Sequence, residues 1–187
     1  MARYLEMLRG AGLGSTPLYK FLEAVSQELD ASDIDVRFPQ VRIGAGGTAP
    51  TVIEINTTLG WLFALGNVAY GESPLSSRRD TAKDVVIGCG WAPSGADPTK
   101  FVKWQFDILC AGIGRDVTVI DYTKSIEVPC PASAAIYQHA AIHLSGPEIA
   151  AFPETDELHF RMSRIASSDD PATPPGLHHF VVVTPLL

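Results

Sequence analysis

Residues 100–112 constrain the fold of this chain most strongly, because apolar and polar side chains alternate along them. The sequence is KFVKWQFDILCAG, in which Lys103, Gln105 and Asp107 separate the apolar residues. The apolar set is Val102, Trp104, Phe106, Ile108 and Cys110. Successive side chains of a β-strand point to opposite faces, so a period of two places the apolar set on one face. The segment is therefore predicted to be a strand with one face in a core and the other in water.

Further strand-like runs follow one another from residue 51 to the end of the chain. They are TVIEINTT, DVVIGCGWA, DVTVID, SIEVP, YQHAAIHLS, ELHFRMSRI and HHFVVVTPLL. Turn-forming clusters such as PSGADPT, AGIGRD and SSDDPATPPG separate them, and SGPEIAAF is compatible with a single helical turn. About seven or eight short strands joined in this way predict a mainly β protein, an antiparallel jelly-roll-like β-sandwich. A hydrophobic content of 46% is sufficient for its core.

The N-terminal part of the chain has a helical pattern instead. In STPLYKFLEAVSQELD, residues 15–30, apolar side chains recur at helical spacing after a capping Ser or Thr. This stripe consists of Leu18, Phe21, Leu22, Val25 and Leu29. A single apolar helix face needs a partner, so we expect the stripe to contact the body or a neighbouring subunit. Trp61, in TTLGWLFALG, is a further candidate for a subunit contact.

The glycine-rich stretch at residues 44–47 marks the predicted boundary between these two parts. Residues 1–48 are predicted to be a small helical N-terminal arm with a linker, and residues 49–187 the β-sandwich domain.

No segment carries a recognisable catalytic, nucleotide-binding or metal-binding motif. The sequence has neither a phosphate-binding loop with its lysine nor a GxSxG elbow. His139 and His143 would share one strand face but lie about 13 Å apart, too far for one metal ion. His178 and His179 are predicted to point to opposite faces of the last strand. The sequence therefore predicts no catalytic residue, no cofactor and no metal, and a protein that is not an enzyme.

Composition narrows the expected partners and compartment. The formal net charge is −7 and no basic cluster stands out, so a nucleic-acid partner is not expected. No apolar run approaches the roughly 20 residues of a membrane span, and the first ten residues do not resemble a secretion signal. The 3 cysteines are widely spaced and odd in number, and we interpret them as buried free thiols of a protein made in a reducing cytoplasm.

The segment DELHFRMSRIASSDDPATPPG resembles the C-terminal hairpin of β-sandwich virion proteins of tailed bacteriophages. In that group an acidic residue opens a strand of the form L-x-F-R-x-x-R, followed by a Ser/Asp-rich loop and a final apolar strand. The matching positions are Asp156, Leu158, Phe160, Arg161, Arg164 and the loop at residues 167–170. The strand around residues 103–106 also looks like the mid-domain strand of those proteins, and the likeness covers roughly residues 50–187.

This resemblance implies a structural virion protein, made in the host bacterial cytoplasm. The implied role is that of a capsid decoration or cement protein, which stabilises the shell as a trimer or other homo-oligomer in contact with the major capsid protein. A tail or spike component that binds host carbohydrate is the alternative, and a sandwich-fold enzyme is a third possibility. Arg161 and Arg164 fall on different faces of a regular strand, and at least one is expected to pair with a carboxylate, within the sheet or across subunits.

Overall fold

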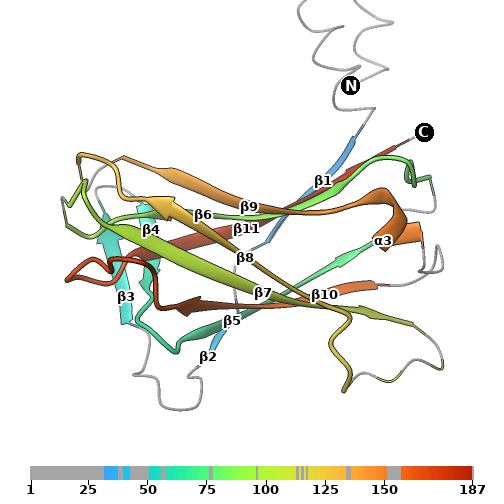
Figure 1. Cartoon of the computed structure of the whole chain (residues 1–187), viewed down its shortest axis with the longest axis horizontal. Coiled ribbons are helices and arrows are strands. Elements are labelled where there is room, and N and C mark those ends of the chain that lie inside the picture. The colour runs from blue at the N-terminus through green and yellow to red at the C-terminus, as the bar shows by residue number, and fades with distance from the viewer. Residues whose placement is uncertain are drawn as a thin grey trace, which may run out of the picture.

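The protein is a sandwich of two antiparallel sheets (Figure 1). The computed structural model describes residues 32–37, 40–42, 51–55, 58–75, 78–95, 97–112, 114, 116, 118–133, 136–150 and 157–186. The first sheet contains β1 (Ser32–Arg37), β3 (Thr51–Ile55), β4 (Thr58–Leu62), β6 (Val85–Ala92), β9 (Gln138–Leu144) and β11 (Gly176–Pro185). The second contains β2 (Gln40–Arg42), β5 (Val68–Pro74), β7 (Phe101–Ala111), β8 (Tyr122–Pro129) and β10 (Glu157–Ile165).

The order of the strands is that of a jelly roll. The first sheet runs β3-β4-β11-β6-β9, with β1 also paired to β11, and the second runs β2-β5-β10-β7-β8. Strand β4 therefore lies beside β11, β5 beside β10, β6 beside β9 and β7 beside β8. Such nested pairs arise when one long antiparallel ribbon is rolled up into two sheets. The predicted fold class is confirmed.

The core lies between the sheets and is built from their inward-facing rows. Trp104 is fully buried, and its ring lies 5.8 Å from Phe63 and 6.0 Å from Trp91. Phe160 of the second sheet meets Phe180 of the first with ring centroids 4.9 Å apart. The whole apolar set of residues 100–112 is buried, as the alternation predicts. All three cysteines are free and buried, as expected.

Within residues 49–187, two strands escaped sequence analysis, and one expected strand is absent. The inward positions of β5 are the small residues Ala69, Gly71 and Ser73, which give little apolar signal. A Cβ at Gly71 would lie 2.3 Å from the ring of Phe160, so the small residue makes room for a large one. Strand β4 is the other strand that was missed. In DVTVID, residues 118–121 form a turn rather than a strand.

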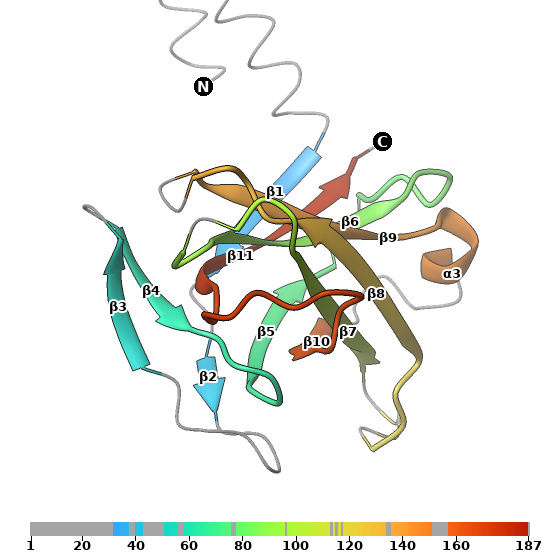
Figure 2. The ribbon, with the colours of Figure 1, turned by 60° about the vertical axis from the view of Figure 1, so that its left-hand side comes forward.

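The expected C-terminal hairpin is wrong. Strands β10 and β11 belong to different sheets, and the loop at residues 166–175 passes from one sheet to the other (Figure 2). Both strands carry a buried row, and these rows face each other across the core, as Phe160 and Phe180 do. Strand β11 does hold the interior position expected from its β-branched run, since β6 flanks one edge and β1 with β4 the other.

The prediction that His178 and His179 point to opposite faces is also wrong. The register of β11 shifts between Leu177 and His179, which marks a β-bulge. Both imidazoles consequently lie against the same Tyr137 ring. Alternation fails because a bulge places two residues opposite one residue of the neighbouring strand.

The sandwich includes residues from before the glycine-rich stretch. Strand β1 pairs with β11, and β2 pairs with β5. The predicted helical stripe of Leu18, Phe21, Leu22, Val25 and Leu29 lies outside the described residues. Helix α3 (Gly146–Ala150) is the single turn expected in SGPEIAAF, and nothing in the described ranges is a helix long and apolar enough to cross a membrane.

Candidate functional site

The outer face of the second sheet carries a row of polar side chains that crosses four strands. Arg161 of β10 lies in register with Tyr70 of β5 on one side and with Asp107 of β7 on the other. Asp107 is in turn opposite Thr123 of β8. Residues directly opposite each other in a sheet share a face, and neighbours of Arg161 along β10 point into the core. We call Tyr70, Arg161, Asp107 and Thr123 the polar row.

Asp107 holds the polar row together through both of its carboxylate oxygens. Arg161 donates to Oδ2 from Nε at 3.0 Å and from Nη2 at 2.5 Å. Oδ1 accepts from Oγ1 of Thr123 at 2.9 Å and from Nε2 of Gln105 at 3.1 Å. The Asp107 side chain is only 4% exposed, whereas that of Arg161 is 45% exposed. The carboxylate is therefore occupied by the protein, and the guanidinium is fixed yet open to solvent.

Charge within the polar row is balanced. The hydrogen bonds from Arg161 to Asp107 are the largest cause that raises the pKa of the guanidinium, and interactions with Tyr70 act in the same direction. Tyr70, opposite Arg161 on β5, is 40% exposed. The row thus offers an aromatic ring and a cation that is already neutralised.

An open groove of about 460 Å³ adjoins Arg161 on the same face. Its walls come from the turn between β4 and β5 and from the end of β10. The lining residues are Leu65, Gly66, Val68, Arg161, Ser163, Arg164, Ile165 and Ala166. Gly66 has a φ of 81°, which glycine adopts at no steric cost, and this allows the tight turn that forms one wall. Leu65 beside it is 45% exposed, so the groove is apolar at this end.

Arg164 points to the opposite side of β10, as predicted, and is nearly buried. Its Nη2 donates to Oδ1 of Asp170 at 3.1 Å, and its Nη1 donates to the carbonyl oxygen of Phe63 at 3.3 Å. Oδ2 of Asp170 accepts from the backbone N–H of Ser167 at 3.2 Å. Both arginines therefore form carboxylate pairs within the chain, and the expectation of at least one such pair is confirmed.

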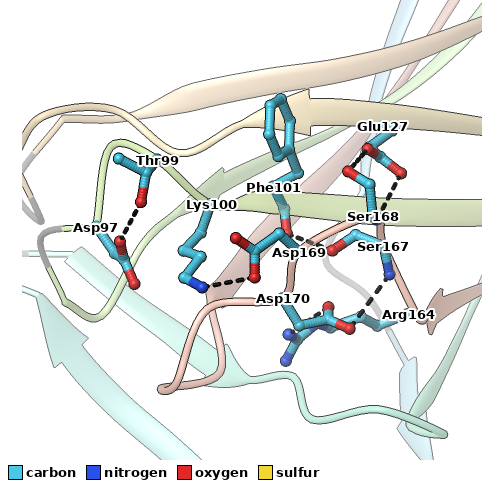
Figure 3. A network of polar contacts seen from close by, with 10 residues as sticks. All are labelled: Asp97, Thr99, Lys100, Phe101, Glu127, Arg164, Ser167, Ser168, Asp169 and Asp170. Carbon is cyan, nitrogen blue, oxygen red and sulfur yellow. Dashed lines mark hydrogen bonds and ion pairs between the residues drawn. The ribbon is translucent and has the colours of Figure 1, made fainter.

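The loop after β10 is fastened to the ends of β7 and β8 by a network of polar contacts (Figure 3). Lys100 donates to Asp169 at 2.5 Å, and the Oγ of Ser167 donates to the carbonyl oxygen of Phe101 at 2.8 Å. Ser168 donates to Glu127 from both its backbone N–H and its hydroxyl. These contacts hold in place the loop that begins at the groove wall formed by Ile165 and Ala166.

The structure brings together residues that the sequence could not connect. The sequence predicted a carboxylate pair or a subunit contact for Arg161, and the subunit contact stays a prediction. Tyr70 lies on a strand that was missed, and Asp107 is 54 positions from Arg161. Trp61 lies on β4 between Val52 and Leu177, half-buried, and its role as a subunit contact stays a prediction. Among the described residues no cluster of three or more His, Cys, Asp or Glu side chains could hold a metal ion.

Comparisons with known proteins do not assign this chain to a family. No protein-family model matches the chain, and no curated protein matches it. Among solved structures, it is similar to an uncharacterized protein from Listeria monocytogenes EGD-e (10% identity, TM-score 0.45, 73% of this chain). The match spans 11% of the length of that protein.

Two smaller proteins are matched over nearly their whole length. One is a family 35 carbohydrate binding module from Clostridium thermocellum (10% identity, TM-score 0.47, 80% of this chain and 98% of that chain). The other is the xylan-binding module CBM15 (10% identity, TM-score 0.49, 82% of this chain and 97% of that chain). Likenesses at these scores carry no argument about function.

Proposed function

We propose that the protein binds a neutral oligosaccharide on the outer face of its second sheet. The observation that carries this proposal is the polar row, in which an exposed Tyr70 lies beside an Arg161 guanidinium that Asp107 fixes in place. The groove next to Arg161 extends the same surface.

A sugar ring has an apolar face of C–H groups and an edge of hydroxyl groups. An exposed phenol ring offers an apolar surface to the first and a hydroxyl to the second. A guanidinium presents several donors in one plane, which suits neighbouring hydroxyls. Because Arg161 is held at 3.0 and 2.5 Å by Asp107, little side-chain entropy is lost when a ligand accepts its remaining hydrogen bonds.

The balance of charge favours an uncharged ligand. Asp107 already compensates Arg161, and Glu72 of β5 and Glu157 of β10 lie on the same face. An acidic sugar would meet no uncompensated cation in the polar row. Neutral hydroxyl groups can replace water there without this penalty.

A glycan array that contains matched neutral and acidic oligosaccharides tests the proposal, followed by an NMR titration of the backbone amides. We expect neutral glycans to bind and to shift the amide signals of β5, β7 and β10. Tyr70→Ala should weaken this binding about tenfold. Val119→Ala, a change of a side chain that is 56% exposed on the loop before β8, is the matched control and should bind as wild type does. Unchanged binding by the Tyr70 variant, or an absence of binding to any glycan, would exclude this face as the site.

The virion role stays a prediction, and so do the homo-oligomer, the contact with a capsid protein and the absence of catalysis. Strand β10 carries the matched pattern, but it pairs with β5 and β7 instead of forming a hairpin with β11. A carbohydrate-binding face fits the alternative drawn from the sequence, a tail or spike component. Copy number on purified particles would separate the virion roles: a decoration protein is present in many copies, whereas a receptor-binding component is present in few and affects adsorption.

A further inference from the structure

A second cluster of rings lies on the opposite side of the sandwich, on the outer face of the first sheet. It consists of Tyr137, which precedes β9, with His139 of β9 and His178 and His179 of β11. The Tyr137 ring lies 5.1 Å from His139, 5.5 Å from His178 and 5.8 Å from His179. We call these four residues the ring cluster.

Two glycines provide the room for this cluster. A Cβ at Gly90 would lie 1.5 Å from the hydroxyl oxygen of Tyr137, so the tyrosine side chain covers the bare backbone of β6. A Cβ at Gly60 would lie 2.9 Å from the ring of His178. The neighbours Cys89 and Trp91 point into the core, which places Gly90, and with it Tyr137, on the outer face.

The Tyr137 ring is held in one orientation while it stays open to solvent. Its hydroxyl lies 2.9 Å from Nδ1 of His179, and the two rings are stacked with an angle of 26° between their planes. Burial raises the pKa of Tyr137 to about 12, so the hydroxyl remains a donor at neutral pH. Tyr137 is nevertheless 39% exposed, and Ile136 beside it is 44% exposed.

One imidazole of the ring cluster, that of His179, is kept neutral by its surroundings. Burial, followed by the proximity of His139 and His178, lowers the pKa of His179, which keeps that imidazole neutral. No ion pair joins Tyr137, His139 or His179 to another residue in the described part of the chain. A neutral imidazole, as in His179, combines one donor and one acceptor.

We propose that the ring cluster is a second binding surface for a neutral sugar ring, centred on Tyr137. An exposed aromatic face with apolar Ile136 at its border receives the C–H side of the ring, and the imidazoles of His139 and His179 receive hydroxyl groups. This surface is separate from the polar row, because the two lie on the outer faces of different sheets. One molecule would then hold two glycan chains, which increases its avidity for a surface that carries many of them.

The test is an NMR titration with four neutral hexasaccharides, namely cellohexaose, xylohexaose, mannohexaose and maltohexaose, each to about 10 mM so that weak binding is detected. At least one should shift the signals of Tyr137, His139 and His179. Tyr137→Ala should lower the affinity of the ring cluster for that sugar about tenfold, whereas Tyr70→Ala should leave this affinity unchanged. His139→Ala is a second variant at an exposed position, and it should weaken the effect without altering the fold.

Two results would overturn this inference. One is that none of the four sugars shifts the signals of the ring cluster in the folded wild-type protein. The other is that Tyr70→Ala removes the shifts at both faces, which would show that only the polar row binds. An absence of shifts at the polar row of the wild-type protein, with shifts present at Tyr137, would refute the proposed function and leave this second surface standing.

Discussion

Arg161 and Asp107 face each other on adjacent strands, with two guanidinium nitrogens on one carboxylate oxygen. The other carboxylate oxygen accepts from Thr123 and Gln105, so Asp107 holds three side chains although it is almost buried. Its partner Arg161 stays half-exposed, and this asymmetry is what makes the pair suitable for a binding surface.

The first prediction concerns the coupling within this pair. We expect Asp107→Asn to lower the free energy of unfolding by about 1–3 kcal/mol, because it weakens hydrogen bonds to a buried acceptor. Arg161→Ala should cost a similar amount, and the double variant less than the sum, with a coupling of about 1 kcal/mol. Urea unfolding of the four proteins measures this cycle. Strict additivity of the two changes would show that the pair contributes nothing beyond its separate residues.

The second prediction compares neighbouring aspartates of the loop after β10. Asp170 compensates Arg164, whose side chain is 4% exposed, so Asp170→Ala leaves a buried cation without its carboxylate. The expected loss is about 3–5 kcal/mol. Asp169 pairs with Lys100 in a setting where the side chains are 54% and 30% exposed, and Asp169→Ala should cost about 0–1 kcal/mol.

Thermal unfolding of Asp169→Ala and Asp170→Ala compares the two ion pairs. The two changes are the same and lie at adjacent positions, so each variant is a control for the other. Equal melting temperatures for the two variants would mean that Arg164 is not held by Asp170. The variants also test whether the loop shapes the groove, because Arg164 is one of its lining residues.

The third prediction concerns Gly71, which lies beneath the ring of Phe160. A Cβ there would lie 2.3 Å from that ring, which is itself 3% exposed and packed against Phe106 and Phe180. Because the ring has no room to move, Gly71→Ala should lower the free energy of unfolding by about 1–3 kcal/mol. Combination with Phe160→Leu should recover part of the loss.

Gly114→Ala serves as the control for this glycine. Its φ is 83°, yet no atom lies within 4 Å of the added Cβ, so only backbone strain is introduced. The expected cost is about 1 kcal/mol or less. The expectation for Gly71 is refuted when its alanine variant unfolds at the same urea concentration as the Gly114 variant.

Alternation of apolar and polar residues was sufficient to predict the fold but not the pairing of strands. The inward row of β7 and the outward position of Arg161 follow directly from a period of two. Strand β5 was missed because its inward residues are small, and the need for glycine at position 71 comes from Phe160, which is distant in sequence. The final hairpin was predicted because β10 and β11 are adjacent in sequence, whereas the jelly roll places these two strands in opposite sheets.

The candidate site was predictable to a smaller extent. The outward position of Arg161 and a carboxylate pair for it or for Arg164 were predicted, but a ligand-binding role was not. Asp107 was predicted to be an ordinary solvent-facing residue of an alternating strand. Its burial results from Arg161, Gln105 and Thr123 converging on it, and the partner strands are set by topology. The ring cluster was hidden by the bulge in β11, since regular alternation separates His178 from His179.

The last prediction is a loss of stability as the pH falls from 7 to 5. His179 has a pKa below its ordinary value of 6.5, mainly because of burial and then because of the neighbouring His139 and His178. The unfolded chain therefore binds a proton at this position at higher pH than the folded protein does, so stability is fully present above about pH 6.5 and falls as the pH drops toward the folded pKa. Carboxylates titrate mostly below this window. Urea unfolding at pH 7.5, 6.5 and 5.5, taken as steps across the window, measures the effect. His179→Asn, which retains an acceptor for Tyr137, should reduce the slope, and an unchanged slope in this variant would assign the pH dependence to other groups.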